Sequence, residues 1–213
     1  MKTSRLILAA ALAAFAGCND DDDNGDPAPP APPASEVLMI EDFSDGFPGP
    51  HWRISEGLPF TDEDRGDSPP GLVLGLFART RAESSFEFST AEPVTAAFDL
   101  STPGVITESN ARFRFTVKRR AFLAGEAAFE VRLQDGVIRF EILGSASEFD
   151  FFTDPAFRRI SFSVDQGVAT WRVDGQPYLT LAGFPEDLYF FEFESSPGGT
   201  LGFVVDNVMV TRP

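Results

Sequence analysis

The sequence predicts an all-β fold, a two-sheet antiparallel jelly-roll sandwich, and three observations support this prediction. Many short stretches alternate polar and apolar residues, which is typical of half-buried strands. Asp-Gly turns separate several of these stretches, and Asp-Gly favours a hairpin because Gly tolerates a positive φ. The chain has 23 phenylalanines but only two tyrosines. Phenylalanine fills the space between two sheets without a hydroxyl that needs a partner.

The clearest strands are those that flank the predicted turns. Residues 112–117 and 129–133 alternate strictly, and Gln134-Asp135-Gly136 then leads into a strand at 137–142. A three-stranded meander follows at 160–164, 168–173 and 178–181, with turns at 165–167 and 174–175. Further strands are predicted at 37–43, 71–78, 84–89, 94–100, 188–194 and 201–211.

The sequence contains few signals for an α-helix. Beyond the N-terminal segment, only residues 119–128 offer a possible helical turn. About a dozen short strands joined by turns are typical of a sandwich or barrel.

Length and charge limit the class of protein. The chain has 213 residues and a formal net charge of −16, with 43% apolar residues, so we expect one globular domain. A nucleic-acid partner would require a basic face, which this acidity argues against. A single histidine and a single cysteine exclude a disulfide framework and a multi-histidine metal site within the chain.

Residues 1–17 have the features of a signal peptide. Lys2 and Arg5 precede a 12-residue apolar run that ends at Gly17, which is too short to span a bilayer. Ala14-Phe15-Ala16 fits ordinary signal peptidase, whereas Phe15-Ala16-Gly17-Cys18 resembles a bacterial lipobox, with cleavage before a lipidated Cys18. We favour the lipobox because Cys18 is the only cysteine and follows the apolar run directly. The prediction is an exported protein, lipid-anchored to the bacterial cell envelope, with the choice of inner or outer membrane open.

Residues 18–36 are predicted to be an extended, disordered linker. They hold six acidic residues, no basic residue and five of the 17 prolines. Such a segment cannot bury enough apolar surface to fold, and its charges repel one another. The remaining residues, 37–213, show no second break in composition and are predicted to form one domain.

Three motifs in order resemble the concanavalin A-like lectin/glucanase superfamily, which includes laminin-G-like domains. The domain opens with Ile40-Glu41-Asp42-Phe43-Ser44-Asp45-Gly46-Phe47, and Trp52 follows; its meander contains Trp171-Arg172-Val173-Asp174-Gly175; it closes on Phe203-Val204-Val205-Asp206-Asn207-Val208-Met209-Val210. The resemblance implies a jelly roll with one concave sheet. Its members include sugar-binding modules, adhesion domains, hydrolases and structural domains, so the fold alone leaves the function open.

The resemblance also implies where catalytic acids would lie. Glucanases of this superfamily carry them on one strand as E-x-D-x-x-E or E-x-D-x-E, and retaining hydrolysis needs two carboxylates about 5.5 Å apart. Glu148 and Asp150 are the nearest match, but the next carboxylate comes only at Asp154. Glu192 and Glu194 form a second same-face pair. Because the motif is broken, we expect a protein without catalytic activity. If the protein were an enzyme, Glu148 and Asp150 would be the candidate catalytic residues.

A structural Ca²⁺ ion is the cofactor that the resemblance implies. Many jelly-roll domains hold it between the first and last strands, where this chain has Glu41, Asp42 and Asp206. Ca²⁺ takes 6–8 oxygen ligands, which carboxylates and carbonyls can supply. A second acidic cluster comprises Asp62, Glu63, Asp64 and Asp67. The alternative for both sets is solvated acids in an acidic protein.

The expected function is a non-catalytic binding or adhesion module, with glycan as the ligand that the resemblance favours. One alternative is a structural envelope lipoprotein whose partner is another envelope protein, and another is a divergent glycoside hydrolase that uses Glu148 and Asp150. Trp52, Trp171, Tyr178 and Tyr189 could form a sugar-stacking platform or pack in the core, and the sequence leaves that open. An exposed aromatic row would favour glycan, and a smooth polar sheet would favour a scaffold.

Overall fold

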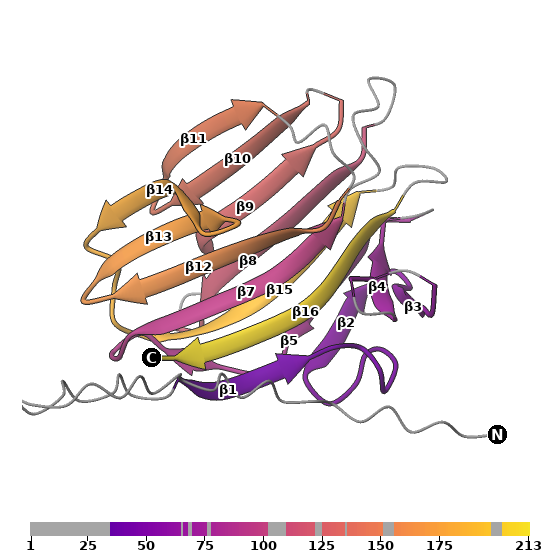
Figure 1. The fold of residues 1–213 in the computed structure, drawn as a ribbon, viewed down its shortest axis with the longest axis horizontal. Coiled ribbons are helices and arrows are strands. Elements are labelled where there is room, and N and C mark those ends of the chain that lie inside the picture. The colour runs from indigo at the N-terminus through magenta and orange to yellow at the C-terminus, as the bar shows by residue number, and fades with distance from the viewer. Residues whose placement is uncertain are drawn as a thin grey trace, which may run out of the picture. The chain divides into compact units, whose positions relative to one another are not determined.

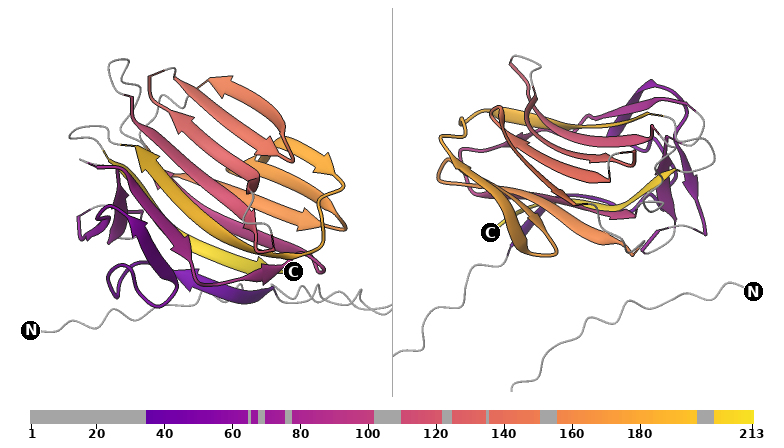
Figure 2. Two further views of the ribbon diagram at one scale, coloured as in Figure 1. Left: turned by 180° about the vertical axis from the view of Figure 1, so that it is seen from behind. Right: turned by 90° about the horizontal axis from the view of Figure 1, so that it is seen from above.

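The computed structural model describes residues 35–64, 66–67, 70–75, 78–101, 110–121, 125–134, 136–150, 156–196 and 202–213. Within these ranges the chain forms 16 strands and no helix, and hence no helix that could cross a membrane. The strands pack as two antiparallel eight-stranded sheets, one on each side of a common core (Figure 1). This confirms the predicted sandwich, and Figure 2 shows its two layers from behind and from above.

The first layer, sheet A, contains both ends of the folded domain. β1 (Glu36–Glu41) pairs with β16 beside the main path of the sheet, so the first and last strands are neighbours. Along that path the strands follow the order β14 (Gln176–Ala182), β13 (Val168–Val173), β12 (Arg158–Asp165), β7 (Val94–Ser101), β16 (Phe203–Arg212), β4 (Gly71–Leu74) and β3 (Phe60–Asp62).

The second layer, sheet B, combines the middle of the chain with strands from both ends. β6 (Phe88–Ser89) pairs with β15 beside the main path. The order along the path is β11 (Ser145–Asp150), β10 (Val137–Ile142), β9 (Gly125–Arg132), β8 (Arg112–Arg119), β15 (Leu188–Ser196), β5 (Thr80–Ser84) and β2 (Trp52–Glu56).

Tight turns join the consecutive strands, as the sequence predicted. Asp174 and Gly175 both have positive φ, 49° and 80°, and connect β13 to β14. Gln166 and Gly167 do the same between β12 and β13. In the turn between β9 and β10, Asp135 lies outside the described residues, and Gly136 has a φ of 63°.

The helical turn at residues 119–128 is wrong for the part that the structure describes. Gly125–Arg132 is strand β9, although Glu126, Ala127 and Ala128 are good helix formers. Pairing with β8 on one side and β10 on the other overrides that local preference. Three strands were also missed, β2, β3 and β11, and the predicted strand at 84–89 is divided between the end of β5 and β6.

Aromatic side chains fill the space between the sheets. The largest fully buried residues are Trp171, Tyr189, Phe43, Phe98, Phe113, Phe115, Phe129, Phe140, Phe162, Phe191, Phe193 and Phe203. Trp171 on β13 also donates a hydrogen bond of 3.1 Å from Nε1 to the carbonyl oxygen of Glu141 on β10, which joins the two layers directly.

The structure settles which of the four candidate platform residues are exposed. Trp52, Trp171 and Tyr189 are buried, at 5%, 0% and 0% exposure. Tyr178 is half-buried, with its ring 4.9 Å from that of Phe149. Every tryptophan and tyrosine of the chain therefore contributes to packing rather than to an exposed aromatic row.

Candidate functional site

Sheet B presents a charged outer face because its strands alternate phenylalanine with charge. On β8, Phe113 and Phe115 are buried in the core, whereas Arg112 and Arg114 are half-buried and paired with acidic side chains. On β15, the rings of Phe191 and Phe193 contact Phe115 across the core face, so Glu192 and Glu194 lie on the opposite face. The period of two that buries the phenylalanines thus gathers the charges on one surface.

A single row across this face alternates in charge from strand to strand. The strand register places its members directly opposite one another on β5, β15, β8, β9, β10 and β11. At about 4.8 Å per strand the row is roughly 24 Å long. We call it the charge ladder, and in order it consists of Arg81, Glu194, Arg114, Glu130, Arg139 and Glu148.

Glu194 on β15 is held by three arginines. It accepts hydrogen bonds from Arg79, Arg81 and Arg112, at nitrogen–oxygen distances of 2.6, 2.9 and 3.1 Å. Burial alone would raise the pKa of Glu194, but the hydrogen bonds from Arg81 and Arg79 outweigh it and lower the pKa to about 2. Glu194 is therefore a fixed anion and not a proton donor at neutral pH.

Glu130 has a similar environment in the middle of the sheet. Arg114 and Arg132 each lie 3.2 Å from its oxygens, and Arg112 lies at 3.8 Å. Two strands away, on β15, Glu192 accepts a hydrogen bond of 2.7 Å from Lys118. These pairs extend the charge ladder sideways into a network.

The two signs of charge differ in exposure. The side chains of Glu192, Glu130 and Glu194 are only 4%, 9% and 11% exposed. The arginine side chains that cover them are 31–47% exposed, namely Arg79, Arg81, Arg112, Arg114 and Arg132. A molecule that approaches the middle of the face therefore meets guanidinium groups, with the carboxylates beneath them.

The structure places the predicted catalytic residues at the free edge of sheet B. Glu148 and Asp150 lie on β11 and line an open hollow of about 340 Å³ with Val137 and Phe149. Glu148 accepts hydrogen bonds from Arg132 at 2.6 Å and from Arg139 at 3.3 Å. The hollow thus holds two of the predicted carboxylates. The third, Asp154, lies outside the described residues.

Sequence reasoning missed a second partial match to the glucanase spacing, on β9. Glu126, Ala128 and Glu130 follow the pattern E-x-D-x-E, with alanine at the central aspartate position. The register places this strand between β8 and β10, within the charged face. Glu126 is paired with Arg119 at 3.1 Å, and Glu130 with the arginines described above. The spacing is visible in the sequence, but it was overlooked because residues 119–128 were assigned to a possible helical turn.

The three predicted calcium ligands do not converge in the structure. Glu41 is 8% exposed and accepts a 2.9 Å hydrogen bond from the Phe43 amide, whereas exposed Asp42 binds the Ser44 hydroxyl at 2.7 Å. Asp206 is fully buried on β16 beside Gly66. No group of three acidic, histidine or cysteine side chains suited to a metal occurs among the described residues. Calcium therefore stays a prediction.

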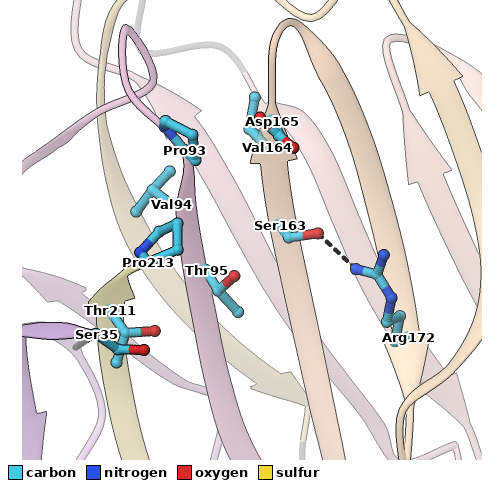
Figure 3. Close-up of a pocket in the computed structure, with 10 residues that line it drawn as sticks. All are labelled: Ser35, Pro93, Val94, Thr95, Ser163, Val164, Asp165, Arg172, Thr211 and Pro213. Atoms are coloured by element: carbon cyan, nitrogen blue, oxygen red, sulfur yellow. Dashed lines mark hydrogen bonds between the residues drawn. The ribbon is translucent and has the colours of Figure 1, made fainter. Parts of the chain in front are cut away.

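Sheet A has a different outer face, which combines small polar side chains with ion pairs such as that of Arg159 with Asp99 at 3.1 Å. An open hollow of about 330 Å³ lies over β16, β7, β12 and β13 (Figure 3). Its floor includes Thr211, Thr95 and Ser163, and Arg172 donates a hydrogen bond to the Ser163 hydroxyl. Where sheet B carries the charge ladder, this hollow is lined by hydroxyl groups together with Asp165 and Arg172.

The lipidation site cannot be placed in the same way. Cys18 and the signal peptide lie outside the described residues, as do residues 18–34 of the predicted linker. β1 begins at Glu36, one residue before the predicted start of the domain.

Comparison with known proteins identifies the fold. No protein-family model and no curated protein matches the chain. Among solved structures, an endo-beta-1,3-glucanase from Pyrococcus furiosus superposes with a TM-score of 0.64 at 12% identity, covering 84% of this chain and 94% of the other. The carbohydrate binding module CBM66 from Bacillus subtilis gives 0.52 at 12%, with 75% and 94% covered. The globular domain of T. cruzi calreticulin gives 0.61 at 10%, with 84% and 88% covered.

Proposed function

We propose that the protein is a non-catalytic glycan-binding module of the bacterial envelope, anchored through a lipid on Cys18, and that glycan binds on the outer face of sheet B. The fold is the concanavalin A-like jelly roll, as the sequence motifs implied. The charge ladder is the observation that carries this proposal. It sets a long row of hydrogen-bond donors and acceptors across six strands, and an extended polymer of hydroxyl-bearing units can follow such a row.

The fold neighbours support a glycan ligand in general terms. They include a carbohydrate binding module and several endo-1,3-beta-glucanases. With identities of 10–13%, they share the fold with this chain. The ligand must therefore be argued from the side chains of sheet B.

Two features favour binding over hydrolysis. A retaining glycosidase needs one carboxylate as nucleophile and a second that delivers a proton. On sheet B, the carboxylates of Glu130, Glu148 and Glu194 are each held by two or more arginines. On β9, moreover, Ala128 takes the central position of the E-x-D-x-E pattern.

A glycan array with the purified protein, run with and without Ca²⁺, tests the proposed function. We expect binding to a defined group of glycans. Failure to bind any glycan would favour a structural lipoprotein. The charge ladder itself gives that alternative some support, since paired charges on neighbouring strands stabilise a sheet without any ligand.

Subcellular fractionation tests the proposed anchor. Wild-type protein should sediment with membranes, and Cys18→Ser should move it to the soluble fraction because the acylated thiol is lost. An unchanged distribution of the variant would reject the lipid anchor and leave the binding module untouched.

The hydrolase alternative has its own test at Glu148. We expect no release of reducing sugar from laminarin, a β-1,3-glucan, by the wild-type protein. If laminarin is cleaved, the non-catalytic proposal fails. The Glu148→Gln variant then decides whether this carboxylate carries the reaction, since its retained activity would clear Glu148.

A further inference from the structure

The exposed cations of sheet B point to a particular class of glycan. Resting on the proposed function, we infer that the ligand is an anionic polysaccharide, whose carboxylate or sulfate groups bind the guanidinium groups along the charge ladder. In the middle of sheet B the carboxylates are buried beneath arginines, so a ligand meets positive charge there.

Cations outnumber acids in this network although the protein is acidic. Among the residues that the structure describes, seven basic side chains take part, together with six acidic ones, whereas the whole chain carries a net charge of −16. The basic members are Arg79, Arg81, Arg112, Arg114, Lys118, Arg132 and Arg139. Their partners are Glu56, Glu130, Glu141, Glu148, Glu192 and Glu194. This network thus carries one positive charge more than negative charges, whereas the domain around it is acidic.

The cations are spaced regularly. Arg81, Arg114 and Arg139 lie on β5, β8 and β10, so each is separated from the next by one intervening strand. Neighbours in this series are therefore about 10 Å apart across the sheet. That separation is close to the length of a disaccharide unit. A polymer with an acidic group on every second sugar, or on every sugar, can place one group at each arginine.

Arginine is well suited to this role even when it is already paired. Its planar guanidinium has five donors, and a carboxylate or sulfate can accept two of them side by side. Arg139, for example, has a side chain that is 38% exposed and is directed to Glu141 at 3.6 Å and Glu148 at 3.3 Å. An incoming anion can use the remaining donors of the guanidinium while Glu141 and Glu148 keep the side chain in place.

A neutral glycan would be expected to need a different surface. Neutral sugars commonly stack their CH faces on exposed aromatic rings, and the tryptophans and tyrosines of this chain are buried or half-buried. On the outer face, the ring of Phe190 is 3% exposed, with the Arg120 guanidinium 5.7 Å from its centre. The face offers charge where an aromatic platform would offer stacking.

The acidic remainder of the protein does not prevent this binding. At physiological ionic strength the Debye length is about 8 Å, so charges on distant surfaces are largely screened at the charge ladder. Binding through the arginines should itself weaken as salt is added, for the same reason. This salt dependence is a signature that stacking on aromatic rings would lack.

Titration of the purified protein with polygalacturonate, a polyuronate, tests the inference, with laminarin as the neutral probe. We expect binding to polygalacturonate that weakens between 50 and 500 mM NaCl. Arg139→Gln and Arg79→Gln should each reduce affinity about two- to fivefold, the range of an exposed ion pair. Both arginines are half-exposed, which keeps the effect on folding small. Arg158→Gln is the matched control, a half-buried arginine of sheet A that is paired with Asp174.

Each outcome bears on one proposal or the other. If laminarin binds and polygalacturonate does not, the inference is overturned and the proposed function stands. If the array and both titrations show no binding, the proposed function fails and the inference fails with it. If Arg158→Gln lowers the affinity as much as Arg139→Gln does, the anion binds elsewhere and the charge ladder is not its site. Circular dichroism of each variant verifies that it is folded.

Discussion

The outer faces of the two sheets differ, although both sheets bury the same kind of core. Sheet B alternates phenylalanine with arginine and glutamate, and its charges meet in the charge ladder. Sheet A has threonine and serine at several outward positions, as at Thr95 on β7 and Ser163 on β12, beside the ion pair of Arg159 with Asp99. Core packing needs only one face of each strand. The other face is free to differ, and on sheet B it carries charged groups that a binding surface can use.

The largest expected effect comes from removing the best-paired carboxylate of sheet B. Glu194→Gln should lower the free energy of unfolding by about 3 kcal/mol, because three arginines lose their common anion in a largely buried site. Ser163→Ala on sheet A, which removes one hydrogen bond from Arg172, should cost about 1 kcal/mol or less. Urea denaturation of both variants measures the difference. If both variants lose the same free energy of unfolding, the outer faces of the two sheets do not differ in their contribution to stability.

Lowering the pH should also reduce the free energy of unfolding, through protonation of Glu194 on sheet B. The folded state holds the pKa of Glu194 at about 2, below its ordinary value of 4.5, so between these values the unfolded chain binds the proton more readily. The stability that Glu194 contributes is present above pH 4.5 and is lost as pH falls towards 2, about 2 kcal/mol after allowance for partial exposure. Urea titrations from pH 7 to 2.5 measure this loss. Glu194→Gln should show a shallower dependence, and a parallel curve would argue against Glu194 as its source.

A bound calcium ion would add a stabilising interaction that only sheet A has. Glu41 and Asp206 lie on β1 and β16, so an ion held there would stabilise the paired terminal strands. EDTA should then lower the melting temperature by about 2–4 °C, which corresponds to roughly 1 kcal/mol in a domain of this size. In Asp206→Ala the melting temperature should no longer respond to EDTA. A wild-type melting temperature that is indifferent to EDTA would remove the ion from consideration.

The smallest effect is expected at the exposed end of the charge ladder. The side chain of Glu148 is 48% exposed, so Glu148→Gln should change the free energy of unfolding by less than about 0.5 kcal/mol. Thermal denaturation at low and high salt measures it. A loss comparable with that of Glu194→Gln would mean that the ladder stabilises the sheet uniformly from end to end.

The sequence predicted the fold class well because local signals were sufficient for it. Period-two alternation at residues 112–117 and the turn at Asp174-Gly175 depend on neighbouring residues only. The charge ladder could not be predicted in this way. Glu194 and Arg81 are separated by 113 positions, and only the strand order brings them together. The alternation of arginine with phenylalanine on β8 was the local sign that one outer face would be charged. The burial of Trp52 likewise depends on contacts with distant residues, such as Phe193.

The place where the N-terminal segment joins the domain has a mechanical consequence. β1 begins at Glu36, is paired with β16 in sheet A, and is opposite Arg212 at its first residue. Suppose that the protein is tethered at its N-terminus and bound to a polymer through sheet B. A pulling force would then act first on the hydrogen bonds between β1 and β16 in sheet A, and it would reach the polymer through sheet B. Between the layers it would pass through the aromatic core and the Trp171–Glu141 hydrogen bond. Under load, the terminal strand would therefore be the first element to yield, while the binding face kept its shape.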